Sequence, residues 1–579
     1  MIHLKHYFAI LLLLLSFGAT GQTTSWNKTT TIDLPETGWN KVLCMKNGNT
    51  LLFHFEVAKS VHVFVFDSGC KQVAEVKHPC GKLDINNFKT SMFKGLYDIN
   101  DEAVLFIEQE HNSWRELVRL RFNSRDGGLI EEKVISESGG VGKPAKFFVM
   151  KNKQDNNYAV LTSIDQMQFK ECTVGIDYYD GNHKQLKLLP LDVPRKDYDY
   201  MSIIGAESQP NGIVVTIALT KLAINGTPSH EGDYDPNSSV YDHYVALYYI
   251  PNNAKAPAVK MIDVTKDIFP YYTNFTYNEF AHNLNLLMLS YTDGVYRNGI
   301  ELRATSLQAS LFLKFDEYSL DLGMSRIRNQ MAVNSQLAKP DSAAFFEGLP
   351  AKMVTNENGL TTLISTSFSR NYNTLGSQGA TALLGATTIT SATSTMNRLS
   401  IDNRLKIYET YLNNIAVTQL NDDGEEIWGT MIPFNQYYVS HGAYYYSYFN
   451  ESKRWQEQMM FGDVPPQVYD RQFHNFNAYT RNNNTYIIYN DYNENFSKPV
   501  GKIADTVFDF YLTNTVCYKV GKRHELSKTY LYGKPGYKEY NSGLIESGDF
   551  DDRKSVYASL IRYMKFNKTE IRMAWSKLD

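Results

Sequence analysis

The sequence lacks the features that define several large classes of protein. No apolar run after residue 15 approaches the roughly 20 residues that a membrane-spanning helix needs, so no transmembrane segment is expected in the mature chain. Lysine and arginine are scattered and the net charge is -4 over 579 residues, which argues against a nucleic-acid partner. The five cysteines form neither a CxxC pair nor a cluster with histidine, so zinc is not indicated.

Motifs of catalysis are missing as well. The chain contains no GxSxG elbow, no HExxH, no Walker loop and no GxGxxG step from strand to helix. The S-x-D-x-G-x-T-W repeat of sialidases is also absent. No reaction can therefore be assigned from a motif.

Helical periodicity is nearly absent outside the N-terminus, and proline is scarce at 18 residues. Aromatic residues, in contrast, make up 13% of the chain, with 40 Tyr and 31 Phe, between many Asn and Gly turns. Aromatic residues pack well on pleated strands, so this composition predicts an all-β protein.

The N-terminus has the pattern of a secretory signal peptide. One lysine precedes the apolar run Phe8 to Leu15, and the small residues Ala19 to Gly21 precede Gln22. Residues 1–21 are therefore predicted to be removed, which makes the protein exported, periplasmic or extracellular. Because the first cysteine is Cys44, far from this cleavage point, a lipid anchor is not expected.

An odd number of cysteines in an oxidising compartment leaves at least one thiol free. Cys70 and Cys80 are close enough in sequence to bridge one strand and its loop, and a disulfide between them is one prediction. Cys44, Cys172 and Cys517 lie in apolar runs, where a buried thiol behaves as a small hydrophobic residue.

A repeat of about fifty residues organises the chain. Cutting it at its turn signals gives four strand-like segments from residue 40, four more from residue 92 and four more from residue 145. The later units are interrupted but keep four segments each, and the tail from Ser542 offers three. The segment Thr29 to Pro35 precedes the first unit and is free to supply the missing strand.

Four-stranded antiparallel units repeated radially are the plan of a β-propeller. Seven whole units, three tail strands and one N-terminal strand predict eight blades, with seven as the alternative. Residues 22–579 then form a single propeller domain whose ring is closed by an N-terminal strand.

The link between third and fourth strands recurs as an apolar residue followed by a polar turn. Examples are FDSG at Phe66, FNSRDGG at Phe122, YDGN at Tyr179 and LNDDGEEIW at Leu420. This pattern resembles the strand-turn-strand signature of exported bacterial β-propeller-type repeat proteins. The resemblance implies the fold and carries no catalytic residue across.

The long connections are not distributed evenly. In an antiparallel four-stranded blade, the loop from second to third strand and the link to the next blade emerge at the same end. The predicted insertions all fall there, at residues 221–242, 292–308, 329–350, 370–403, 433–474 and 491–506. Function is therefore expected on this end, which we call the insertion face.

Aromatic residues concentrate in the insertion that links the sixth and seventh units. Tyr and Trp stack on sugars or bury in protein interfaces, which makes a set of them candidates for ligand binding. The alternative is that they only cover the blades beneath. The candidate residues are Tyr444, Tyr445, Tyr446, Tyr448 and Trp455.

Two loops of the insertion face place oxygen-bearing side chains at alternate positions, as calcium loops do. They are Asp491, Asn493 and Asn495 in YNDYNENF and Asp233, Asp235 and Asn237 in DYDPN. The first loop has Phe496 where the full pattern needs glycine and Lys502 where it needs glutamate. Calcium is therefore a possible ligand, ordinary turn chemistry is the alternative, and no cofactor is required.

Three functions fit these observations. The favoured one is a binding or scaffold protein without chemistry, whose insertion face takes a glycan, a peptide or a cell-envelope protein. The second is a glycan-processing hydrolase or lyase with carboxylates, such as Asp233, Asp235, Glu231, Glu451 or Asp491, in the axial funnel. The third is a structural subunit of a cell-envelope assembly.

Overall fold

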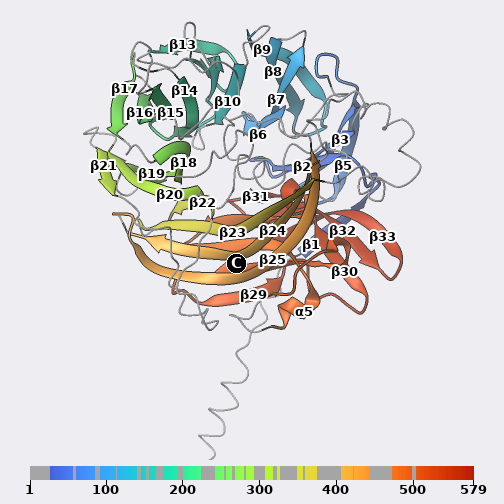
Figure 1. Cartoon of the computed structure of the whole chain (residues 1–579). Helices are drawn as coiled ribbons and strands as arrows, with labels where there is room; N and C mark the ends of the chain where they lie inside the picture. The colour runs from blue at the N-terminus through green and yellow to red at the C-terminus, as the bar shows by residue number, and fades with distance from the viewer. Residues whose placement is uncertain are drawn as a thin grey trace, which may run out of the picture.

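A computed structural model gives the structure of the chain (Figure 1). It describes residues 27–578 apart from 57–59, 85–91, 112–113, 140–144, 152–154, 165–173, 193–197, 199, 223–240, 253–255, 264–267, 279–281, 293–306, 317–321, 326–348, 357–358, 375–405, 422, 443–471 and 499–503. The predicted signal peptide lies outside the described residues. No helix among the residues described is long and apolar enough to cross a membrane.

The first four blades are antiparallel sheets whose strands pair in sequence order. Their strands are β2 (Trp39–Cys44), β3 (Thr50–Glu56), β4 (Ser60–Phe66) and β5 (Gln72–His78); β6 (Phe93–Ile99), β7 (Glu102–His111), β8 (Trp114–Asn123) and β9 (Leu129–Gly139); β10 (Ala145–Lys151), β11 (Tyr158–Ile164), β12 (Val174–Tyr179) and β13 (Gln185–Leu191); β14 (Tyr200–Gln209), β15 (Gly212–Leu222), β16 (Tyr241–Pro251) and β17 (Ala258–Asp263).

Blades five to seven repeat this plan, and blade eight modifies it. Their elements are β18 (Ile268–Asn278), β19 (Asn283–Thr292), β20 (Leu307–Asp316) and β21 (Leu322–Ser325); β22 (Leu349–Thr355), β23 (Thr361–Thr374), β24 (Lys406–Leu420) and β25 (Glu426–Gly442); β26 (Phe476–Arg481), β27 (Asn484–Asp491), α5 (Asn493–Phe496), η6 (Phe510–Leu512), β28 (Asn514–Val520) and β29 (Leu526–Tyr530); β30 (Glu539–Gly543), η7 (Ile545–Ser547), β31 (Asp549–Asp551), β32 (Val556–Lys565) and β33 (Lys568–Lys577).

The blades form a ring, as Figure 1 shows, with the first strands toward the axis. First strands of successive blades contact one another, for example β14 with β18 and β18 with β22. The ring closes where β1 (Asn27–Ile32) pairs with β33 as the outermost strand of blade eight. The predicted eight-bladed, all-β propeller closed by an N-terminal strand is therefore confirmed.

Each blade buries its second strand on both faces, because it packs between two neighbouring blades. Every side chain of β3 from Thr50 to Phe55 is buried. Odd-numbered residues such as Phe53 pack with blade two, and even-numbered ones such as Leu52 pack with blade eight. A largely apolar run thus indicates a second strand that is buried on both faces, whereas a strand with one exposed face would alternate apolar and polar residues.

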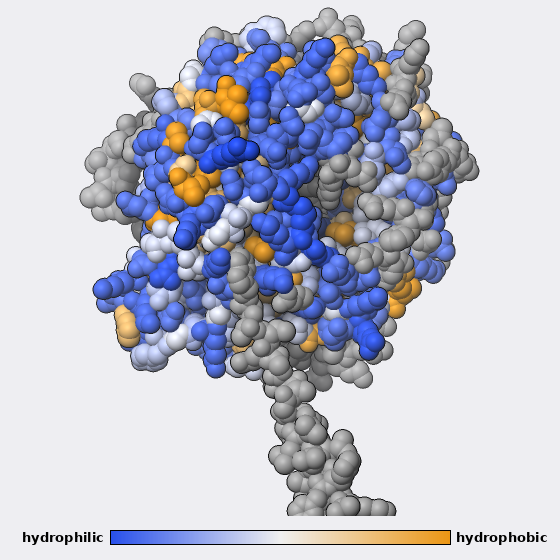
Figure 2. Space-filling view, turned by 180° about the vertical axis from the view of Figure 1, so that it is seen from behind, coloured by the Kyte–Doolittle hydropathy of each residue, from blue (hydrophilic) through white to orange (hydrophobic). Residues whose placement is uncertain are grey.

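Outer strands follow a different pattern. The second residue of the fourth strand is an exposed aliphatic side chain in five blades: Val73, Ile130, Leu186, Val259 and Ile427. Figure 2 shows one face of the molecule, where hydrophobic residues form small separate patches on a largely hydrophilic surface. Isolated exposed aliphatic residues of this kind are ordinary in folded proteins.

The turn between third and fourth strands has the same geometry in blades one, three and six, whereas the turn of blade two is one residue longer. In blade three Asp180 Oδ1 accepts hydrogen bonds from the amides of Asn182 and Lys184, at 2.9 and 2.8 Å. The residue between them, His183, takes a positive φ of 65°. Cys70 and Gly424 occupy the same position in blades one and six. The shared turn sequence therefore specifies an Asx-type turn.

Two predicted boundaries in blade six are wrong. The insertion expected from residue 370 begins only after β23 ends at Thr374, and the link expected from residue 433 begins after β25 ends at Gly442. β23, β24 and β25 have 14, 15 and 17 residues, against seven in β3. The extra residues continue the sheet by about 23 Å beyond the ring, as the long strands of Figure 1 show.

Three smaller predictions also need correction. The expected loop at residues 491–506 contains the short helix α5, and the first of the three strand segments expected in the tail, GLIES at residues 543–547, divides between β30 and the turn η7. The predicted disulfide is wrong in this structure, because Cys70 and Cys80 are free thiols. They flank the seven-residue β5, which separates them by about 23 Å, whereas disulfide Cα atoms lie within about 7 Å of each other.

Candidate functional site

Most of the sequence-predicted site lies outside the described residues. This holds for Tyr444, Tyr445, Tyr446, Tyr448 and Trp455 and for the loop with Asp233, Asp235 and Asn237. These residues stay predictions. The third predicted group, Asp491, Asn493 and Asn495, is described, and it lies on the insertion face of blade seven.

Asp491 ends β27, and α5 follows directly. Its carboxylate is nearly buried, with 4% of the side chain exposed, and pairs with Lys528 of β29 at 3.2 Å. Its other oxygen accepts hydrogen bonds from the Tyr492 amide at 2.9 Å and from Asn495 Nδ2 at 2.7 Å. Burial raises the pKa of Asp491 and lowers that of Lys528, while the attraction between the pair opposes both shifts.

Lys528 reaches Asp491 through an aromatic surround. Its ammonium lies 5.1 Å from the ring centre of Phe496 and 5.0 Å from that of Tyr518. Phe496 also stacks on Tyr530 at 3.9 Å. These rings exclude water from the ion pair, so removing one partner would leave the other charge poorly solvated.

Asn495 and Tyr492 connect this ion pair to the loop after residue 503. Asn495 Nδ2 donates to the Asp505 carbonyl at 2.8 Å, and its Oδ1 accepts from the Asp505 amide at 2.6 Å. The Tyr492 hydroxyl accepts from the amides of Phe508 and Asp509, at 3.1 and 2.9 Å. The motif therefore anchors the segment 504–509, which we call the anchored loop.

The anchored loop also joins the extended sheet of blade six. The Val507 amide donates to the Asn435 carbonyl at 2.9 Å, and the Tyr437 amide donates to the Val507 carbonyl at 3.1 Å. Val507 forms a parallel bridge with Gln436 of β25. The loop thus lies along the outer edge of β25 and ties blade seven to blade six.

Phe508 stands at the exposed side of the anchored loop. Its side chain is 63% exposed, and its ring lies 5.2 Å from that of Tyr437. Leu512, 41% exposed, follows in η6. Because the backbone around Phe508 is hydrogen bonded on both sides, its ring is presented in one position, which lowers the entropy lost when a ligand binds.

In this structure the side chains of the predicted calcium motif bond to protein groups. Asn493 Oδ1 accepts from Asn514 Nδ2 at 3.0 Å, while Asp491 and Asn495 hold the contacts given above. Among the residues that the structure describes, no group of three or more His, Cys, Asp or Glu side chains could hold a metal ion. The calcium site stays a prediction; Asp491 and Asn495 belong to the anchor of the loop, and Asn493 bonds to β28 through Asn514.

His474, which the sequence places at the end of the aromatic link, is buried beside Phe510 at a ring distance of 4.0 Å. Gln472, two residues earlier, bonds Asn40 of β2 at 3.0 Å. This region joins blade seven to blade one, so His474 packs as a core residue.

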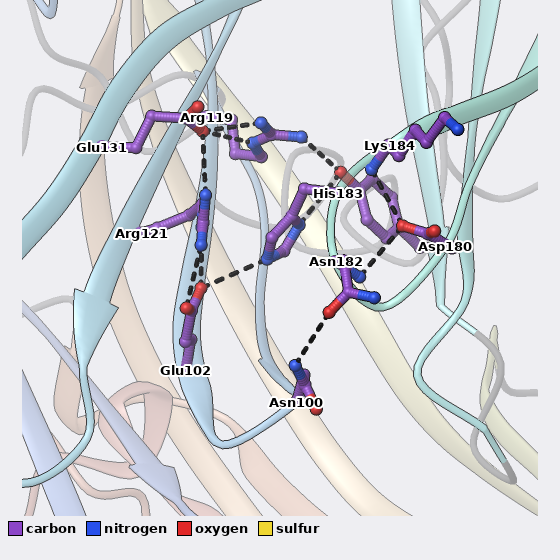
Figure 3. A network of polar contacts seen from close by, with 10 residues as sticks. Asn100, Glu102, Arg119, Arg121, Glu131, Asp180, Asn182, His183 and Lys184 are labelled. Carbon is purple, nitrogen blue, oxygen red and sulfur yellow. Dashed lines mark hydrogen bonds and ion pairs between the residues drawn. The ribbon is translucent and has the colours of Figure 1, made fainter.

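A second polar network, which sequence reasoning missed, joins blades two and three (Figure 3). Arg119 donates to Glu131 at 2.6 Å and to the Tyr158 hydroxyl at 2.6 Å. Tyr158 contacts His183 Nδ1 at 3.3 Å.

The network closes through Glu102. His183 Nε2 lies 3.2 Å from Glu102, and Arg121 pairs with the same carboxylate at 2.7 Å and lies 3.8 Å from Glu131. The six side chains thus form a closed ring, the blade-two ring, which Figure 3 shows between the two sheets.

Burial and the neighbouring arginines lower the pKa of His183 to about 4, so the imidazole is neutral near pH 7. Burial raises the pKa of Tyr158. Although burial opposes it, the paired arginines hold the pKa values of Glu102 and Glu131 below the usual range. A neutral histidine held between two ion pairs indicates a structural contact between blades two and three.

The turn residues DGNH, which contain His183, were the only feature of the sequence that could have drawn attention to this network.

A third set of polar contacts joins blade one to blade eight and blade six to blade seven. Asp549 accepts a hydrogen bond from the Cys44 amide at 2.7 Å, and burial raises the pKa of its carboxyl to about 6. Lys41 donates to the Glu546 carbonyl, and Lys352 donates to the Ala478 carbonyl. Lys41 of β2 thus ties blade one to η7 of blade eight, and Lys352 of β22 ties blade six to the first strand of blade seven.

No protein-family model and no curated protein matches the sequence. Among solved structures, the WD40 domain of SCAP from fission yeast aligns with a TM-score of 0.34 and 10% identity, covering 95% of this chain and 98% of that one. A mutant of Synechocystis apocarotenoid oxygenase aligns at 0.29 and 10%, covering 73% and 97%. The Penicillium chrysogenum α-L-arabinanase complexed with arabinobiose aligns at 0.30 and 12%, covering 59% and 94%. Scores this low carry no argument about function.

Proposed function

We propose that this β-propeller is an exported binding or scaffold protein whose insertion face, at blades six and seven, takes a glycan, a peptide or a cell-envelope protein without chemical turnover. The anchored loop carries the proposal. It holds the 63% exposed ring of Phe508 in one position beside Tyr437 of β25, the strand that precedes the predicted aromatic residues in the sequence. A rigid exposed aromatic side chain is typical of binding surfaces.

The carboxylates described near this loop support binding over hydrolysis. Asp491 pairs with Lys528, and Asp505 pairs with Lys498 at 2.7 Å. Asp509 accepts from the Tyr511 amide at 2.9 Å and so caps η6. A glycosidase needs two carboxylates on either side of an open substrate site, whereas these three serve the loop itself.

The test is a screen of the chain from Gln22 onward on glycan, peptidoglycan and peptide arrays, with detection of released products. We expect binding without product. Phe508→Ala should weaken binding about tenfold, because truncation of an aromatic anchor commonly costs more than 1 kcal/mol. Leu186→Ala, which removes a 58% exposed side chain from the outer strand β13, is the matched control and should bind as the wild type does.

Two results would contradict the proposal. Product formation on any array would replace it with the hydrolase. If Phe508→Ala bound as the wild type does and Leu186→Ala lost binding, the ligand would bind at the outer strand β13 and not at the insertion face.

A further inference from the structure

Two tips project side by side from the insertion face of blade eight. One is the link 533–538 between β29 and β30, and the other is the two-residue turn 566–567 between β32 and β33. The Phe566 amide donates to the Lys538 carbonyl at 3.0 Å, and Glu539 pairs with Lys565 across the sheet. Figure 1 shows β30, β32 and β33 side by side in this blade. The two tips therefore form one surface.

Each tip has an aromatic ring at its crest. Tyr537 is 79% exposed, more than any other large hydrophobic side chain among the residues described, and Phe566 is 58% exposed. Neither ring belongs to a hydrophobic cluster of the described core. More than half of each side chain is exposed, so the fold gains little from their apolar area.

The backbone at both tips is strained. Phe566 has a φ of 55° and Lys538 a φ of 52°. This left-handed region is unfavourable for a bulky side chain, and a two-residue hairpin turn normally places glycine or asparagine there. A strained residue that does not stabilise the fold points to a function.

Lysines surround the two rings. Lys534 and Lys538 flank Tyr537, and Lys565 and Lys568 flank Phe566; all four are exposed. The carboxylate beside them is Glu539, whose Oε2 lies 3.7 Å from Lys565 Nζ and accepts from the Gly536 amide at 3.2 Å. Glu570, two residues after Lys568, pairs with Arg572 at 2.7 Å, so four lysines against Glu539 leave the surface positive. We call these four lysines with Tyr537 and Phe566 the tip patch.

We propose that the tip patch docks the protein on the surface of an anionic lipid bilayer. Tyr537 and Phe566 enter the interface between headgroups and acyl chains, and the four lysines lie against the lipid phosphates. A bilayer fits because it is fluid and accepts two protruding rings without a complementary pocket. The charge of the lipid phosphates complements the lysines. The inference stands apart from the proposed function, since it uses blade eight alone.

Vesicle flotation with the chain from Gln22 onward tests the proposal. We expect binding to phosphatidylcholine vesicles that contain phosphatidylglycerol, little binding to phosphatidylcholine alone, and loss of binding at high salt. Each lysine changed to glutamine should lower the partition constant about fivefold. Lys522→Gln, an exposed lysine on the opposite end of blade seven, is the matched control and should have no effect.

Phe566→Gly separates docking from folding. Glycine adopts a positive φ without strain, so the variant should unfold at the same temperature as the wild type or higher. Its vesicle binding should fall about tenfold, because the variant lacks the ring that would be buried in the bilayer. The matched control is Leu188→Asn, which removes a 62% exposed side chain from the outer strand β13 without introducing a flexible glycine. Its vesicle binding should equal that of the wild type.

Three results would overturn the proposal. They are equal binding to neutral and anionic vesicles, unchanged binding by Phe566→Gly, and binding to soluble heparin without flotation on any vesicle. The last result would assign the tip patch to a soluble polyanion. None of these readouts depends on the glycan and peptide arrays, so the two proposals can fail separately.

Discussion

The blade-two ring and the anchor at Asp491 use the same chemistry for different purposes. Both contain an ion pair with one buried partner, at 2.6 Å for Arg119 with Glu131 and at 3.2 Å for Lys528 with Asp491. The blade-two ring joins blades two and three by side chains alone. The anchor instead holds backbone groups of a loop, and that loop carries an exposed ring. One polar network thus holds two blades together, and the other holds a loop that presents an exposed aromatic ring.

The largest effect should come from Asp491→Ala. The change leaves Lys528 charged beside aromatic rings and frees Asn495, so the free energy of unfolding should fall by about 3 to 5 kcal/mol. Urea unfolding measures it. The double variant with Lys528→Met should recover most of the loss, because no unpaired charge remains. If the double variant is as unstable as the single one, the ion pair is not what holds the loop.

Arg119→Met tests the blade-two ring in the same way. Arg119 is 3% exposed but Glu131 is 28% exposed and can be hydrated, so we expect a loss of about 2 to 3 kcal/mol. Arg115→Met on the same strand is the matched control, with a 39% exposed arginine and an expected loss of about 1 kcal/mol or less. Hydrogen exchange should show the Arg119 loss in blades two and three. If Arg119→Met instead reduced protection in the anchored loop, the conclusion that the two networks are independent would be wrong.

The acid response should separate the two networks further. The pKa of His183 is about 4 in the folded protein against 6.5 in the unfolded chain, so the unfolded chain takes up the proton first as pH falls. Stability is then lost between pH 6.5 and 4, by up to 1.36 kcal/mol per pH unit. His183→Asn removes this group and keeps a residue that tolerates the positive φ of 65°.

The measured quantity is the difference in slope between wild type and His183→Asn. Asp549, whose pKa burial raises to about 6, acts in the opposite direction, and His54, whose pKa burial lowers to about 4, acts in the same direction. Both remain in the variant, so they cancel in the difference. Parallel curves for the two proteins would show that His183 is not held neutral by the blade-two ring.

The smallest effect on stability should come from Phe508→Ala. The ring is 63% exposed, so the free energy of unfolding should change by no more than about 0.5 kcal/mol. Urea unfolding, as for Asp491→Ala, measures this change in free energy, and thermal unfolding provides a second measurement. A loss as large as that of Asp491→Ala would mean that Phe508 supports the loop and does not serve as a displayed ring.

The fold was readable from the sequence because a propeller repeats one local pattern. Four segments per unit, the turn that holds Asp180 and the free strand before residue 40 were each visible. The boundaries of β23 and β25 were not, since the extra strand residues contain the same Tyr, Asn and Thr as a loop. Composition alone does not separate an extended edge from an insertion in such segments.

The candidate site was only partly predictable. The alternate spacing of Asp491, Asn493 and Asn495 drew notice as a metal pattern, but Lys528 and Asp505 lie too far along the chain to be recognised as its partners. The blade-two ring joins residues of five strands and turns, from Glu102 to His183. Such networks depend on which blades become neighbours, and one sequence gives no direct view of that.

The strand β1 gives the fold an order in time. β1 precedes every other strand of the ring in the sequence, and its partner β33 follows all of them. The first strand of the ring must therefore wait, unpaired, for the last one. A chain that lacks β33 has an open edge on β32 and no site for β1, so it is exposed to aggregation and proteolysis. Closure of the ring thus acts as a check that every strand of the ring has been made.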